Sequence, residues 1–120
     1  MSKKYIIDNI EFNADVVMEG FKTIFHYIGS HVLKYDDQEL ADEIYEDYDF
    51  HYTDLADFRL DILLDSGHIT DDIRLKAQEM RSLSEKMFAE SVERSANIVR
   101  NSAEWQRIIS LADQISGAFK

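Results

Sequence analysis

The chain has 120 residues, with 24 Asp and Glu against 13 Lys and Arg, and its formal net charge is −11 at pH 7. It contains no Cys, which excludes disulfide scaffolds, thiolate metal sites and cysteine nucleophiles. The excess of acid disfavours direct binding to nucleic acid or to an anionic membrane and favours a cationic protein partner. No apolar run exceeds three residues, so we expect neither a signal peptide nor a membrane span. We expect a cytoplasmic protein with a single helical domain over residues 1–120.

The N-terminal third predicts one helix after a short irregular start. Residues 5–12 alternate apolar and polar side chains weakly, which permits a short strand or an extended arm. Asn13 or Asp15 can cap a first helix that runs to about Leu33. Gly29 and Ser30 are expected to end or bend it.

Four further helices follow from the spacing of apolar residues and from capping signals. The second begins at Asp36 and ends near Tyr48 or Asp49, and the third begins with Thr53 as its cap and stops at Ser66-Gly67. Residues 70–99 predict a long fourth helix, and Asn101-Ser102 caps the last. The inner face of the fourth helix is expected to comprise Ile73, Ala77, Met80, Ser84, Met87, Ser91, Ser95 and Ile98. The predicted fold class is an all-α, single-domain bundle of about five helices, with a short N-terminal extended segment where residues 5–12 form a strand.

The negative charge is concentrated in the middle of the chain. Residues 36–72 contain 14 acids and one cation, Arg59, for a net charge of −13, whereas the rest of the chain carries +2. In the second helix the acids occupy the face opposite the apolar residues, with no cation among them. A solvated face that aids solubility is the simplest interpretation, but like charges packed this densely destabilise a fold.

The third predicted helix repeats this pattern in a narrower form. Asp54, Asp57, Asp61 and Asp65 share one stripe about 80° wide, where Lys or Glu would favour the helix more. Reversing Asp57 and Asp61 to Lys is therefore expected to leave the fold intact or slightly more stable, and to abolish partner binding. Tyr52 and Phe50 lie between the two acidic helices, and aromatic side chains beside charges are typical of protein interfaces. The predicted partner-binding residues are Glu39, Asp42, Glu43, Glu46, Asp47, Asp49, Tyr52, Asp54, Asp57, Asp61 and Asp65.

No motif indicates catalysis. Asp47-x-Asp49-x-His51 resembles the start of a calcium loop, but Tyr52 and Phe58 stand where that loop requires Gly and Glu. The four His residues form no metal-binding pair and have no evident Ser partner in the sequence. We therefore predict no catalytic residues, no metal site and no cofactor. A metal-dependent helical enzyme that uses Asp57, Asp61 and Glu46 is the minor alternative.

The size, the helical pattern, the lack of Cys and the acidic segment 36–72 resemble the small immunity proteins of bacterial toxin–immunity systems, such as contact-dependent growth inhibition. The resemblance is one of class, and no individual residue is carried over. It implies a cytoplasmic inhibitor that covers the basic active site of a cognate nuclease toxin domain. The second hypothesis is a nucleic-acid mimic of phage or plasmid type, which occupies the groove of a DNA- or RNA-binding protein. The sequence leaves the oligomeric state open.

Overall fold

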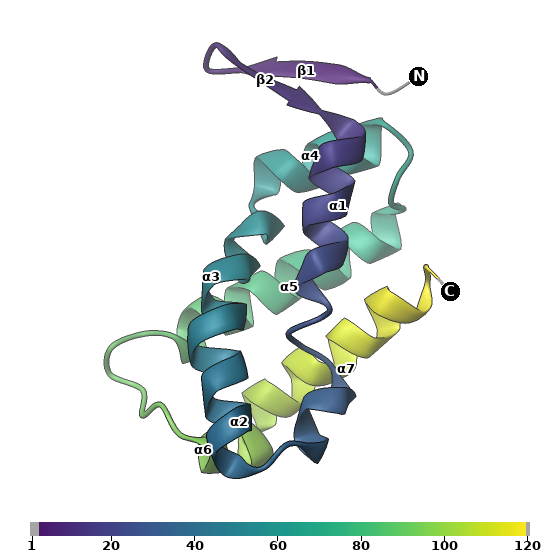
Figure 1. The fold of residues 1–120 in the computed structure, drawn as a ribbon. Helices are drawn as coiled ribbons and strands as arrows, with labels where there is room; N and C mark the ends of the chain where they lie inside the picture. Colours follow the sequence, from purple (N-terminus) through teal and green to yellow (C-terminus); the bar gives the residue numbers. More distant parts are fainter. Residues whose placement is uncertain (1–2, 120) are drawn as a thin grey trace.

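The computed structural model describes residues 3–119, which form a mainly helical fold with one antiparallel hairpin (Figure 1). Strand β1 (Lys4–Ile7) pairs with β2 (Ile10–Asn13), with Tyr5 opposite Phe12. Asp8 and Asn9 form the two-residue turn with φ of 51° and 66°, a conformation that Asp and Asn tolerate. The extended segment is thus a β-hairpin, and the expectation of an all-α fold is correct only in part.

The first helix is shorter than its apolar pattern indicates. Helix α1 (Ala14–Ile24) begins at Asn13, whose side chain accepts hydrogen bonds from the backbone N–H groups of Asp15 and Val16. It ends nine residues before Leu33, and the 3-10 helix η1 (Ser30–Lys34) follows. Gly29 has φ of 150°, and a Cβ there would lie 3.0 Å from Asp113 Oδ1. Gly29 therefore does not end α1, which stops five residues earlier. It takes a backbone conformation that favours glycine and directly precedes η1.

The second helix is continuous and contains a π-helical turn. Asp36 caps α2 (Asp37–Asp42), which continues through the π-helical segment η2 (Glu43–Tyr48) into α3 (Asp49–His51). We call residues 37–51 the acidic helix. Its inner face is formed by Leu40, Ile44 and Tyr48, which are fully buried.

The third predicted helix is two separate elements. The 3-10 helix η3 (Tyr52–Leu55) is followed by α4 (Asp57–Asp65), which begins after Ala56. Thr53 does not cap α4, because its hydroxyl donates to the carbonyl of Phe50. The predicted stop at Ser66-Gly67 is confirmed, and Gly67 has φ of 81°.

The prediction of a long fourth helix is wrong for the second half of residues 70–99. Thr70 caps α5 (Asp71–Met87), which ends twelve residues before Val99. Residues 88–95 form an irregular connection in which Ser91 is exposed, and Ser95 caps α6 (Ala96–Asn101). Ser102 then caps α7 (Ala103–Gly117), as predicted.

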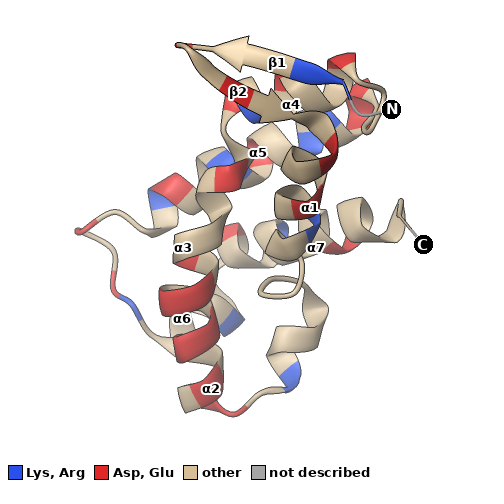
Figure 2. Ribbon diagram, turned by 45° about the horizontal axis from the view of Figure 1, so that its top comes forward, with Lys and Arg blue, Asp and Glu red and all other residues tan. Residues whose placement is uncertain are grey.

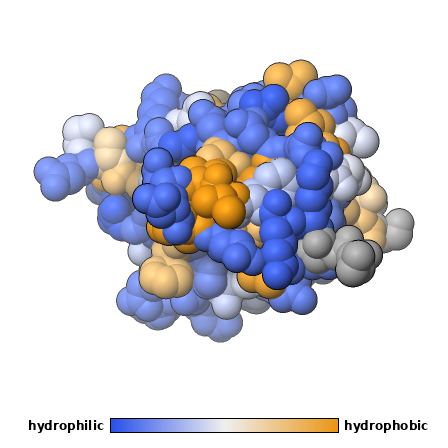
Figure 3. Space-filling view, turned by 90° about the horizontal axis from the view of Figure 1, so that it is seen from above, coloured by the Kyte–Doolittle hydropathy of each residue, from blue (hydrophilic) through white to orange (hydrophobic). Residues whose placement is uncertain are grey.

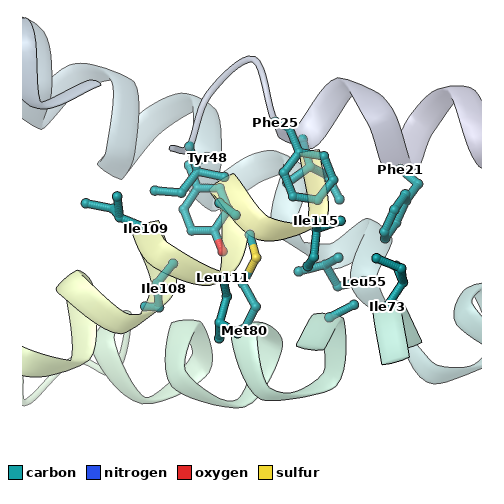
Figure 4. Packing of buried hydrophobic residues seen from close by; sticks show 14 of the residues in the cluster. Phe21, Phe25, Tyr48, Leu55, Ile73, Met80, Ile108, Ile109, Leu111 and Ile115 are labelled. Carbon is teal, nitrogen blue, oxygen red and sulfur yellow. The ribbon is translucent and has the colours of Figure 1, made fainter. Parts of the chain in front are cut away.

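The buried side chains form one hydrophobic cluster between α5, α7, α1 and the acidic helix. In Figure 4 the ring of Tyr48 points into this cluster near Met80 and Leu111. Beside it lies an aromatic group in which Trp105 contacts Tyr45, Tyr48 and Phe88 with ring centroids 5.4–6.3 Å apart. This packing fixes the inner side of the acidic helix, so its outer side faces solvent in a defined orientation.

Candidate protein-binding surface

Asp and Glu are frequent along the acidic helix (Figure 2), and a group of carboxylates lies opposite its buried side chains. Most of these side chains are exposed and Glu43 is half-buried. Within residues 3–119 none of them forms an ion pair with Lys, Arg or His, although most other acids of the segment do. We call this group the acidic face, and it comprises Glu39, Asp42, Glu43, Glu46 and Asp47.

At two positions of the acidic face the surroundings disfavour the ionised form of the carboxyl group. Partial burial, and then the neighbouring charge of Asp47, raise the pKa of Glu43, although His31 opposes this effect. A hydrogen bond from its side chain to Asp36 and the charge of Asp36 raise the pKa of Glu39. The raised pKa values mean that the folded protein disfavours the ionised form of both carboxylates.

Hydrogen bonds on the inner side of the acidic helix attach it to the rest of the fold. The Tyr45 hydroxyl donates to the carbonyl of Ser95 at 2.9 Å and accepts from the N–H of the same residue at 3.1 Å. The Tyr48 hydroxyl is hydrogen-bonded to Ser84. Both tyrosines belong to the π-helical segment, so the carboxylates of this segment project from a rigid support.

Asp49 and Tyr52, which the sequence places in the interface, contribute instead to packing. The Asp49 carboxylate accepts from Arg94 at 3.3 Å, and the Arg94 guanidinium lies over the rings of Tyr45 and Phe88. Tyr52 is half-buried against Phe88, with ring centroids 5.2 Å apart. Phe50, in contrast, is 75% exposed at the end of the acidic helix.

The negative charges of Asp54, Asp57, Asp61 and Asp65 are compensated by nearby cations. These cations lie elsewhere in the sequence or about one turn away. Asp61 pairs with Arg74 at 2.5 Å and Asp57 with Arg81 at 3.6 Å, both cations belonging to α5. Within the same stripe, Asp54 lies 3.8 Å from Arg59, and Asp65 lies 2.7 Å from Lys3. A structural role therefore accounts for these aspartates, and the sequence argument that they are uncompensated no longer holds. For the same reason we now expect reversal of Asp57 and Asp61 to Lys to cost some stability, because it would replace two ion pairs with repulsion of Arg81 and Arg74.

The structure contains a series of hydrogen bonds from a Ser through a His to an Asp that the sequence did not predict, since no Ser partner for any His was evident. His68 Nδ1 lies 2.7 Å from Ser66 Oγ, and His68 Nε2 lies 2.8 Å from Asp15 Oδ1. The nearby N–H groups of Gly67 and His68 donate to the carbonyls of Leu64 and Leu63, so they cannot form an oxyanion hole. This series of hydrogen bonds joins the end of α4 to the start of α1, and no local motif could reveal it because Asp15 is distant in sequence.

Two other kinds of site, a metal centre and a membrane-spanning helix, are absent from residues 3–119. Over residues 3–119, no cluster of three or more His, Asp or Glu side chains has the arrangement needed to bind a metal ion. Over the same residues, no helix is both long enough and apolar enough to cross a bilayer. Comparison with protein-family models, with curated proteins and with solved structures finds no match to this chain.

Proposed function

We propose that this chain is a protein-binding module that docks a basic partner against its acidic face, and that it acts in the cytoplasm as an immunity protein against a nuclease-type toxin domain. The observation that carries the proposal is the contrast within one segment. The aspartates of α4 are ion-paired, whereas the five carboxylates of the acidic face are not, within the described residues. A cationic partner would supply the missing compensation.

The chemistry of a nuclease suits such a surface. Its active site binds a polyanion, and carboxylates can occupy the positions of phosphates. Opposite charges also accelerate encounter and fix the orientation of docking. Phe50 would add an exposed aromatic contact at the edge of the carboxylates, as interfaces commonly require. Inhibition would then be steric, because the module covers the site and performs no reaction itself.

The π-helical segment lends independent support. π-helical turns are rare in proteins and are frequent at functional sites. Here the turn lies directly beneath Glu43, Glu46 and Asp47. It lies in the part of the chain where the charge is least compensated by ion pairs.

The experiment compares two variants with the same change of charge. Asp42→Asn/Glu46→Gln/Asp47→Asn removes three charges from the acidic face. Glu19→Gln/Asp71→Asn/Glu90→Gln removes three exposed charges elsewhere. Each protein is immobilised and used to capture partners from a bacterial lysate at low and moderate salt, and the captured protein is then purified and assayed for nuclease activity.

The proposal predicts capture of one basic nuclease domain by the wild type and by the second variant, and its loss from the first. The purified nuclease is inhibited at equimolar ratio, and its association slows as salt screens charges beyond about 8–10 Å. A DNA- or RNA-binding protein without nuclease activity would instead support the nucleic-acid mimic. Equal capture by both variants, or an association rate indifferent to salt, refutes docking through the acidic face.

A further inference from the structure

The hairpin has one unpaired edge. Within the described residues the sheet contains only β1 and β2. The two-residue turn makes Ile7 and Ile10 a hydrogen-bonded pair, so Tyr5 also bonds inward to Phe12. The N–H and C=O groups of Lys4 and Ile6 therefore point away from β2, along the free edge of β1. Such an edge is a template for another strand.

A groove runs beside this edge, between β1 and α4. It has a volume of about 240 Å³ and a mainly apolar lining of Tyr5, Ile7, Phe58 and Ile62, with Asp61 and Asp65 at its margin. On the outer side of the hairpin Ile6 is 74% exposed. Figure 3 shows the molecule from the hairpin end, where hydrophobic residues gather within a hydrophilic surround. A strand added to β1 would lie across the groove and cover its apolar lining.

We propose that this strand is β1 of a second copy of the chain, and that two hairpins join into a four-stranded antiparallel sheet. With Ile6 opposite Ile6 of the second copy, the two residues exchange a pair of backbone hydrogen bonds. Tyr5 then faces Ile7 of the second copy, on the side of the groove. Lys4, which pairs with Glu11 of its own hairpin at 3.3 Å, also faces Asp8 of the second copy, so opposite charges meet at both ends of the contact.

The distribution of charge favours a second copy as the occupant. Each chain carries a net charge of −11, so most contacts between two copies would be repulsive. The hairpin is an exception, since Lys4 and Asp8 are symmetrically placed about Ile6. Figures 1 and 2 both place the hairpin and α2 at opposite ends of the molecule, whose longest dimension is 44 Å. The dimer would keep the two acidic faces far apart and open to other partners.

The absence of Cys permits a direct test by cross-linking. In Ile6→Cys the two thiols would lie across the two-fold axis, with Cα atoms about 5.5 Å apart, within the range of a disulfide. The control is Leu75→Cys, which places a thiol on α5 at a site of similar exposure, 66% against 74%. We expect Ile6→Cys to form a covalent dimer on the order of tenfold faster than the control under mild oxidation. Equal rates overturn the proposal.

A second pair of variants tests the backbone pairing without a cross-link. Ile6→Pro removes the outward N–H but no hydrogen bond of the hairpin itself, whereas Ile6→Thr keeps that N–H and a β-branched side chain. By sedimentation equilibrium the dissociation constant of the dimer should rise on the order of tenfold in the Pro variant and change little in the Thr variant.

Circular dichroism establishes that the Pro variant retains its fold. If the Pro variant unfolds, the comparison of the two cross-linking rates alone tests the proposal. The proposal is overturned if the wild-type protein remains monomeric up to about 1 mM. It is also overturned if the protein stays monomeric while it binds a foreign extended peptide.

Discussion

The Tyr48 hydroxyl lies 2.5 Å from Ser84 Oγ, and both residues are completely buried. Ser84 donates in turn to the carbonyl of Met80 at 2.7 Å, so Tyr48 is the donor to Ser84. The pair connects the acidic helix to α5. With the bonds between Tyr45 and Ser95, it fixes the candidate surface against the rest of the fold.

Removing either partner should cost stability, but by different amounts. In Ser84→Ala the Tyr48 hydroxyl remains buried without a partner, which costs about 1–3 kcal/mol. In Tyr48→Phe the Ser84 hydroxyl keeps its bond to Met80, so the loss is nearer 1 kcal/mol. Urea unfolding measures both, with exposed Ser82→Ala as the control. Equal losses would contradict the assigned direction of the bond.

Alkaline pH should weaken the fold through the same tyrosine. Burial raises the pKa of Tyr48 above its ordinary value of 10.0, although the bond to Ser84 opposes this. Below pH 10 both the folded and the unfolded state hold the proton, so there is no effect. At higher pH the unfolded state releases it first, and the free energy of unfolding falls as pH rises.

Thermal unfolding between pH 8 and pH 11 measures this slope. Tyr48→Phe should reduce it without abolishing it, because the pKa values of Tyr5, Tyr45 and Tyr52 are also raised. An unchanged slope in Tyr48→Phe would show that the effect arises from the other tyrosines.

Charge reversal should separate the compensated acids from the uncompensated ones. Asp61→Lys replaces an ion pair with repulsion of Arg74, and we expect a loss of about 1 kcal/mol in the free energy of unfolding. Asp47→Lys relieves the repulsion of Glu43, and we expect no loss or a gain of about 0.2–0.5 kcal/mol. Urea unfolding at low salt distinguishes them. If Asp47→Lys is the more harmful change, the acidic face is part of the folding machinery rather than a free surface.

The hairpin should loosen when its link to α4 is cut. Asp65 accepts from Lys3 at 2.7 Å and from the Tyr5 hydroxyl at 2.6 Å. Asp65→Asn weakens both bonds, so the backbone amides of Tyr5 and Phe12 should exchange with solvent faster than in the wild type. Asp71→Asn, at an exposed position of α5, is the control.

Acid should mimic this change. The bonds from Lys3 and from Tyr5 lower the pKa of Asp65 below its ordinary value of 3.8. Its contribution to stability is therefore complete above that value and is lost as pH falls through the lowered pKa of the folded state. Hairpin amides in the wild type should lose protection over this interval, while those of Asp65→Asn should not. Identical profiles in the two proteins would contradict the role of Asp65.

Local signals predicted the parts of the fold that local contacts determine. Asn13, Asp36 and Ser102 cap their helices as expected, because each side chain bonds an N–H two or three residues away. Ser95 was misread as a small residue inside a long helix, although its hydroxyl caps α6. Periodicity alone does not distinguish an interrupted helix from a continuous one when the apolar spacing resumes in phase.

For a related reason, the sequence predicted only part of the candidate surface correctly. The amphipathic pattern of residues 36–48 identified the outer carboxylates, since they share one helix with their own buried face. The partners of Asp57, Asp61 and Asp65 lie on α5 and at the N-terminus, and their positions depend on tertiary packing. A stripe of like charge therefore appears uncompensated in sequence when its cations arrive from other elements.

The placement of Trp105 also provides an internal optical reporter. It is the chain's only tryptophan, and it is fully buried in contact with Tyr45 and Tyr48 of the acidic helix. Its fluorescence should be emitted at short wavelength in the folded state, with energy received from both tyrosines. A ligand that shifts the acidic helix would change this emission, whereas one that docks on its outer carboxylates without moving it would leave the spectrum unaltered. Titration of the unlabelled protein can thus distinguish a rigid docking surface from one that rearranges.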